Sequence, residues 1–247
     1  MVVQGLLYGT TANRTASGPT SNVHGLELMQ ASKDVLVALD HLHSNNLMHC
    51  DVKPANILVM PPRDSKSLRL AICDLGHSIA GVAQSKRFKS QQTPLYRAPE
   101  VAMHLALTPA ADVWSTGLVL VEMWSYREGD GHGEWHTGPL MRAKDWMLQA
   151  GMIFAKASHN TVLLAMIKSR FGHPNKRWFE SLEGCAKQAA GAFWRSTAEP
   201  MLVTIQHIPI EHPCSHPKQF SKLLLQWEPS RRSTAKDVLC SDLFEKH

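Results

Sequence analysis

Apolar and polar positions in the first part of the chain repeat with the period of a helix. From about Leu26 to His43, apolar residues recur every three or four positions, at Leu28, Ala31, Val35, Leu36, Leu39 and Leu42. This spacing places their side chains on one face of an α-helix. Ser44-Asn45-Asn46 follows with residue types that tolerate turn geometry. The pattern predicts an amphipathic helix of about four to five turns.

Shorter apolar segments predict a few strands beside a mainly helical remainder. Leu47-Met48 and Ile57–Met60 flank a polar loop, and Leu68–Ile72 alternates like a half-buried strand. Helical patterns follow at residues 110–125, 140–156, 160–171, 178–195 and 218–226, and the first of these is apolar enough to be buried. Ser233-Thr234 can cap a last short helix that continues to Leu239. We therefore expect a mainly α fold with a few short strands.

Composition and charge exclude several classes of protein. The 247 residues are 44% hydrophobic and 19% charged, which is ordinary for a globular chain and argues against disorder. No apolar run approaches the roughly 18 residues that cross a bilayer, and no basic segment precedes an apolar run at the start. The net charge of +5 is a mild excess without a basic stripe, and the 5 cysteines form no Cys-x-x-Cys pair. We expect an intracellular protein, cytoplasmic or nuclear, that binds neither membrane nor nucleic acid.

One polar loop holds residue types that phosphoryl transfer requires. Asp51, Lys53 and Asn56 lie in this loop, and Asp74 follows the next strand. A carboxylate can orient a hydroxyl and accept its proton, and an ammonium can neutralise phosphate charge. An amide and a second carboxylate offer the hard oxygen ligands that Mg²⁺ prefers. Taken alone, an Asp-x-Lys pair in a loop is more often a solvated ion pair, so the assignment depends on the wider arrangement.

Five short sequence motifs, in a fixed order, favour phosphoryl transfer over a solvated ion pair. They are His49 to Leu58, Cys73 to Gly76, Tyr96 to Glu100, Asp112 to Gly117 and Glu228 to Ala235. In order and spacing they resemble the eukaryotic protein kinase family of the serine/threonine type, over residues 1–247 but only as its C-terminal lobe. Tyr96-Arg97 and Gly172-His-Pro174 are similar to the CMGC group within that family.

The resemblance implies a role for each matching residue. In the catalytic loop, Asp51 would be the catalytic base and Lys53 the phosphate-neutralising lysine. Asn56 and Asp74 would bind Mg²⁺, and Leu58 would form the floor under the adenine of ATP. Thr93 would contact the base and the lysine. Structural support would come from His49, Glu100, Asp112 and Arg232, with Glu100 and Arg232 as a buried ion pair and Asp112 beneath the catalytic loop. ATP and Mg²⁺ are thus the expected cofactors, and a protein Ser/Thr hydroxyl the expected phosphate acceptor.

Departures from the family pattern shape the remaining expectations. No Gly-x-Gly-x-x-Gly loop and no Val-Ala-x-Lys strand precede Asp51, and the lysine upstream of the loop, Lys33, lies in the amphipathic helix. We therefore expect that the β-rich N-terminal lobe is absent. Residues 1–25 would then be a hinge-like segment and residues 129–157 an insert-like loop region. Cys50 replaces the arginine that usually pairs with an activation-loop phosphate, which implies activity without loop phosphorylation.

Two functions remain open on these grounds. The first is a truncated serine/threonine kinase that transfers the γ-phosphoryl group of ATP, with a protein substrate and an activating or scaffolding protein as its partners. The alternative is a catalytically inactive pseudokinase or lobe fragment that acts as a binding module. Intact Asp51, Lys53, Asn56 and Asp74 favour the first function.

Overall fold

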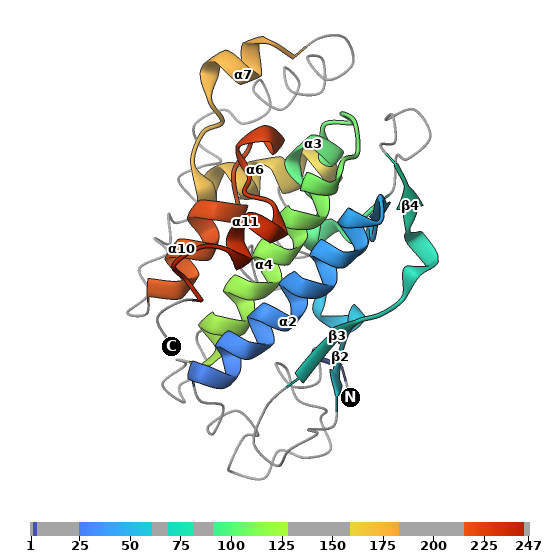
Figure 1. Ribbon diagram of the computed structural model, residues 1–247. Coiled ribbons are helices and arrows are strands. Elements are labelled where there is room, and N and C mark those ends of the chain that lie inside the picture. Colours follow the sequence, from blue (N-terminus) through green and yellow to red (C-terminus); the bar gives the residue numbers. More distant parts are fainter. Residues whose placement is uncertain are drawn as a thin grey trace, which may run out of the picture.

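Two long helices form the centre of the molecule. The computed structural model describes residues 2–3, 25–60, 69–81, 91–127, 159–182 and 215–244. Helices α2 (Gly25–Ser44) and α4 (Pro109–Arg127) pack side by side (Figure 1). The other described helices are shorter: α3 (Pro99–Ala102), α6 (His159–Phe171), α7 (Lys176–Glu180), α10 (Ser215–Leu224) and α11 (Ala235–Leu239). The architecture within these residues is mainly α.

The described strands form two small antiparallel pairs. Strand β1 (Leu47–Met48) pairs with β4 (Ile79–Ala80), and β2 (Ile57–Met60) pairs with β3 (Arg69–Ile72). In the second pair Ile57 lies opposite Ile72, and the Cys73 amide donates to the Asn56 carbonyl at 2.9 Å. The two pairs therefore bring the polar loop 49–56 and residues 73–76 to the same side of the helices.

Helix α4 supplies much of the core. Trp114, Leu118, Leu120 and Trp124 on this helix are at most 1% exposed. Gly117 allows the close approach of α10, because a Cβ atom built at this position would meet Leu224 Cβ and Leu225 Cδ2 at 2.8 Å each. A helix that is apolar on several faces is buried on several faces, as the sequence of this segment predicts.

Most predicted elements agree with the structure. The helices expected near residues 26–43, 110–125, 160–171 and 218–226 correspond to α2, α4, α6 and α10, and the strand expected at 68–72 corresponds to β3. The short apolar segments at 47–48 and 57–60 form β1 and β2. Thr234 caps α11 in a capping box with Asp237. Only the start of the helix expected at 178–195 falls on described residues, where α7 begins at Lys176 and ends at Glu180, and residues 183–195 lie outside them.

Some expectations fall on other parts of the chain. The insert-like region 129–157 and nearly all of the hinge-like segment 1–25 lie outside the described residues. None of the helices that the structure describes combines the length and apolar composition that a bilayer crossing requires.

Candidate active site

The carboxylate of Asp51 is the centre of the candidate site. This side chain is buried, and both of its oxygens accept hydrogen bonds. Oδ2 accepts from Lys53 Nζ at 2.6 Å and from Asn56 Nδ2 at 3.1 Å. Oδ1 accepts from Thr93 Oγ1 at 2.7 Å and from the Thr93 amide at 3.1 Å. Lys53 Nζ also donates to Thr93 Oγ1 at 3.0 Å, so the four side chains form one network.

These contacts determine the charge state of Asp51. Burial by itself would raise the pKa of the carboxyl, but hydrogen bonds from Lys53 and Thr93 and the Lys53 charge outweigh it. The pKa of Asp51 therefore lies below its ordinary value. An ionised carboxylate within hydrogen-bond reach of a hydroxyl can accept the hydroxyl proton.

The local fold of the loop explains why three of these residues meet. Lys53 has an extended backbone, and Pro54 starts the short 3-10 helix η1 (Pro54–Asn56), where its missing N–H is tolerated. This turn carries Asn56 back towards Asp51, and Asn56 Nδ2 also donates to the Asp51 carbonyl at 2.9 Å. The loop is thus closed by its own side chains.

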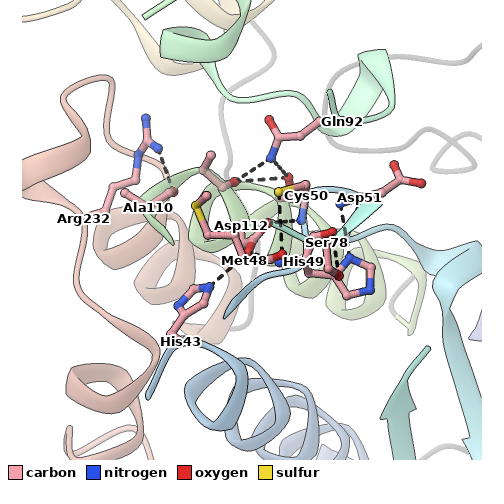
Figure 2. A network of polar contacts seen from close by, with 12 residues as sticks. His43, Met48, His49, Cys50, Asp51, Ser78, Gln92, Ala110, Asp112 and Arg232 are labelled. Atoms are coloured by element: carbon pink, nitrogen blue, oxygen red, sulfur yellow. Dashed lines mark hydrogen bonds and ion pairs between the residues drawn. The ribbon is translucent and has the colours of Figure 1, made fainter. Parts of the chain in front are cut away.

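Asp112 of helix α4 supports the loop from its other side. Its carboxylate accepts from the backbone amides of His49 at 2.7 Å and of Cys50 at 2.8 Å. The same carboxylate contacts His43 Nε2 of α2 at 3.1 Å (Figure 2). Cys50 adopts a positive φ of 65° between these amides and Asp51. Because several N–H groups satisfy this buried carboxylate, it holds the backbone of the loop rigidly against α4.

His49 links the loop to the segment that carries Asp74. The ring is fully buried; its Nδ1 accepts from the Asp51 amide at 3.2 Å, and its Nε2 lies 2.9 Å from the Cys73 carbonyl. These partners require the tautomer with the proton on Nε2. Cys73 directly precedes Asp74, so His49 connects the loop that carries Asp51 with the segment that carries Asp74.

Asn56 and Asp74 fit the demands of a magnesium site. Within the described residues, the hydrogen bonds of the Asn56 side chain are made through Nδ2, which leaves Oδ1 for a ligand. Asp74 is exposed with a positive φ of 66°, and its Oδ1 accepts from the Gly76 amide at 3.3 Å. No hydrogen bond joins the side chains of these two described residues. Mg²⁺ usually takes one or two protein oxygens and completes its shell with water and phosphate, so this donor set suits it.

Leu58 lies where strand β2 meets the start of the chain. It is half-buried, pairs with Ala71 of β3, and forms an isolated antiparallel bridge with Val2. The structure thus places Leu58 on the element that follows Asn56 directly.

Glu100 and Arg232 are in direct contact across the molecule. Arg232 Nη1 and Nη2 donate to the two Glu100 oxygens at 2.6 Å each, and both side chains are at most 1% exposed. The guanidinium also donates to the carbonyls of Ala110 and Trp227. Such a bidentate pair with further partners is a well-satisfied buried ion pair.

Sequence reasoning did not find Gln92, Glu122 and His43, which also contribute contacts to this region. Gln92 is buried beside Thr93, Tyr96 donates to Glu122 at 2.8 Å, and His43 contacts Asp112. Gln92 lies in a polar stretch beside Gln91, and Glu122 lies in an otherwise apolar helix pattern. An acidic residue within an apolar helical pattern is a signal for a buried partner, and it could have identified Glu122. No comparable signal marks Gln92.

Comparison of the sequence with known proteins identifies relatives of this chain. The family description "Protein kinase domain" matches residues 9–244. Extracellular signal-regulated kinase 1 of Dictyostelium discoideum is 27% identical over 216 residues, which are 85% of this chain and 34% of that protein. Mitogen-activated protein kinase kinase kinase 3 of Arabidopsis thaliana is 37% identical over 98 residues, 39% of this chain and 14% of that protein. The chain therefore spans only a minor part of these relatives' lengths.

A solved structure shows the same fold. A chain in the crystal structure of the yeast RNA Pol II CTD kinase complex matches with a TM-score of 0.65 and 19% identity. The match covers 100% of this chain and 68% of that chain.

These matches correct one expectation. The expectation that the N-terminal β-rich lobe is absent is wrong, because the kinase domain match begins at residue 9 and the solved kinase chain is matched by 100% of this chain. The expectation was based on two motifs that are missing upstream of Asp51. A family match is scored over the whole chain, so it can include residues that lack these motifs. The mainly helical character with few strands agrees with the structure.

Since the kinase domain match spans residues 9–244 and the five sequence blocks lie within it, the chain belongs to the protein kinase domain family.

Proposed function

We propose that this chain is a serine/threonine protein kinase that transfers the γ-phosphoryl group of ATP to a protein hydroxyl. The observation that carries the proposal is the Asp51 carboxylate, which Lys53, Asn56 and Thr93 hold by hydrogen bonds of 2.6–3.1 Å. Phosphoryl transfer depends mainly on positioning and charge neutralisation, and this cluster supplies a fixed carboxylate beside a fixed ammonium.

In this mechanism each residue has a separate task. Asp51 orients the acceptor hydroxyl and takes its proton, because its low pKa keeps it ionised at neutral pH. Lys53, which is already hydrogen-bonded to Asp51, neutralises charge on the phosphoryl group as it moves. The Thr93 hydroxyl holds the Asp51 carboxylate and the Lys53 ammonium in place, because it donates to the first and accepts from the second.

Two further assignments concern ATP and its metal. Asn56 Oδ1 and the Asp74 carboxylate would hold Mg²⁺, and Leu58 would lie under the adenine ring. When bound, the metal supplies charge neutralisation on the phosphate oxygens. The exposed position of Asp74 and the unused oxygen of Asn56 support this assignment.

Resemblance to known kinases supports the serine/threonine specificity, the CMGC-like assignment and the proposed protein partners. Lys53 and Thr93 are the pair that the resemblance associates with serine/threonine specificity, and the Dictyostelium relative supports the CMGC-like assignment. The substrate is then a protein. Because the solved relative is described as a complex, an activating or scaffolding protein is also proposed as a partner.

Radiolabel transfer tests the proposed function. The purified chain is incubated with Mg²⁺, γ-labelled ATP and casein or myelin basic protein, and the labelled amino acids are separated. We expect label on serine and threonine. Asp51→Asn should lower kcat by about 10²-fold or more, since positioned bases contribute about 10²–10⁴. Asp242→Asn is the matched control because Asp242 is exposed.

Two results would contradict the proposal. Equal transfer by Asp51→Asn, with an unchanged melting temperature, would remove Asp51 from the mechanism. A wild-type chain that is stabilised by Mg-ATP in a thermal shift but transfers no label would support the alternative of an inactive binding module.

A further inference from the structure

Gln92 is a buried polar residue that the proposed mechanism does not use. The residue is 5% exposed, and its backbone has a φ of 65°. Residues with a Cβ rarely adopt this left-handed region, and they keep it only where surrounding contacts determine it. The contacts of Gln92 therefore need an explanation.

The Gln92 side-chain amide uses all of its main hydrogen-bonding capacity. Nε2 donates to the Ala111 carbonyl at 3.0 Å and to Ser115 Oγ at 2.9 Å, both on helix α4. Oε1 accepts from the Ala98 amide at 2.9 Å. An amide offers two N–H donors and one carbonyl, so each has a partner here.

The Gln92 backbone adds two further connections. Its amide donates to the Cys50 carbonyl at 3.1 Å, and its carbonyl accepts from Arg97 Nη2 at 2.9 Å. Figure 2 shows Gln92 above Cys50. One residue thus joins the catalytic loop, helix α4 and the segment 93–98.

These connections determine the placement of the next residue, Thr93. The Thr93 amide and hydroxyl both donate to Asp51, and the hydroxyl accepts from Lys53. Since the Gln92 amide is tied to the loop and its side chain to α4, the peptide that carries Thr93 has little freedom. Loss of the Gln92 side chain would free residues 92–98 from α4 without removing any group that contacts Asp51.

We propose that Gln92 is a positioning residue that holds Thr93 against Asp51 and Lys53 through uncharged hydrogen bonds to α4 and Ala98. The effect on activity rests on the proposed phosphotransfer, but the placement of Thr93 can be measured without it. All five described hydrogen bonds of Gln92 join it to protein groups, so this anchor requires no phosphate on the segment.

Hydrogen exchange tests the placement directly. Gln92→Gly permits the positive φ and removes only the side-chain bonds, while Gln92→Asn keeps an amide that is one methylene shorter. Exposed Gln219→Ala is the control. We expect the amides of Thr93 and Ala98 to exchange at least tenfold faster in both Gln92 variants and unchanged in the control. Unchanged exchange in either folded variant would overturn the proposal, as would unfolding of the whole chain by both, because it would show a general structural role.

Kinetics provide the second readout. We expect kcat to fall at least tenfold in Gln92→Gly, with the KM for ATP changed less than threefold, because Thr93 contacts Asp51 and Lys53. A rise in the KM for ATP with kcat unchanged would overturn the positioning role. If the wild-type chain transfers no phosphate, the proposed function fails, and the exchange of Thr93 and Ala98 still decides the role of Gln92.

Discussion

Glu122 and Tyr96 show how the burial of one side chain changes its chemistry. The Tyr96 hydroxyl donates to Glu122 Oε2, and Glu122 Oε1 has no hydrogen-bond partner among the described residues. Burial raises the pKa of Glu122 to about 8 and also raises the pKa of Tyr96. At neutral pH both groups are therefore largely uncharged, and this pair joins η4 (Pro94–Tyr96) to α4 without an ion pair.

Glu122→Gln should make stability less dependent on pH. Folded Glu122 holds a proton that unfolded glutamate releases above its ordinary pKa of 4.5. The wild-type free energy of unfolding should therefore fall as pH rises from about 4.5 to about 8, by on the order of 1 kcal/mol per pH unit. Urea unfolding at pH 5, 6.5 and 8 measures this slope. Identical slopes in wild type and Glu122→Gln would show that Glu122 is ionised in the folded chain.

The contact between helices α4 and α10 depends on one small residue. Gly117 on α4 leaves room for Leu224 and Leu225, and each leucine is at most 4% exposed. Since α4 also carries Asp112 and Ser115, a shift of this helix would reach the candidate site. The helix pair thus supports both the core and the loop 49–56.

Gly117→Ala should destabilise the chain in spite of the higher helix propensity of alanine. Propensity favours alanine by about 1 kcal/mol, whereas overpacking costs about 1–3 kcal/mol. The new Cβ would meet two carbon atoms at 2.8 Å, so the leucine side chains or the helices must move. We expect a net loss of about 1 kcal/mol in urea unfolding. The exposed control Lys33→Ala should stay within about 0.5 kcal/mol of wild type, and a stabilised Gly117→Ala would contradict the packing argument.

At the scale of the whole molecule, the Glu100–Arg232 ion pair ties distant parts of the chain together. Glu100 lies in the first turn of α3 and Arg232 follows η5 (Pro229–Arg231), at a sequence separation of 132 residues. Arg232 also lies over the Trp114 ring, with its Cζ 5.1 Å from the ring centroid. The pair therefore connects the segment after Thr93 with the last part of the described chain and with α4.

Arg232→Ala should be among the most damaging single substitutions. It leaves the Glu100 carboxylate buried without its partner, which costs about 3–5 kcal/mol. The double variant Glu100→Ala with Arg232→Ala removes the orphan charge, so its loss should be smaller than the sum of the two single losses. Urea unfolding of the four proteins measures this coupling. Additive losses would show that the two side chains act independently.

The sequence by itself determined the order of most elements and the residue types of the candidate site. The period of apolar residues predicted α2 and α4, and the five ordered blocks pointed to the family, because these are local signals within short stretches of chain. It predicted wrongly that the N-terminal lobe is absent, since missing motifs do not define where a family match begins.

Only the tertiary structure decided which polar side chains meet. The contacts of Gln92 with α4, of Tyr96 with Glu122 and of His43 with Asp112 join residues 19 to 69 positions apart. No local pattern encodes such pairs, because they form only when helices pack and exclude water from groups that then need partners. The residue types of the candidate site could be predicted from the chain, whereas the network that holds Asp51 in place results from packing.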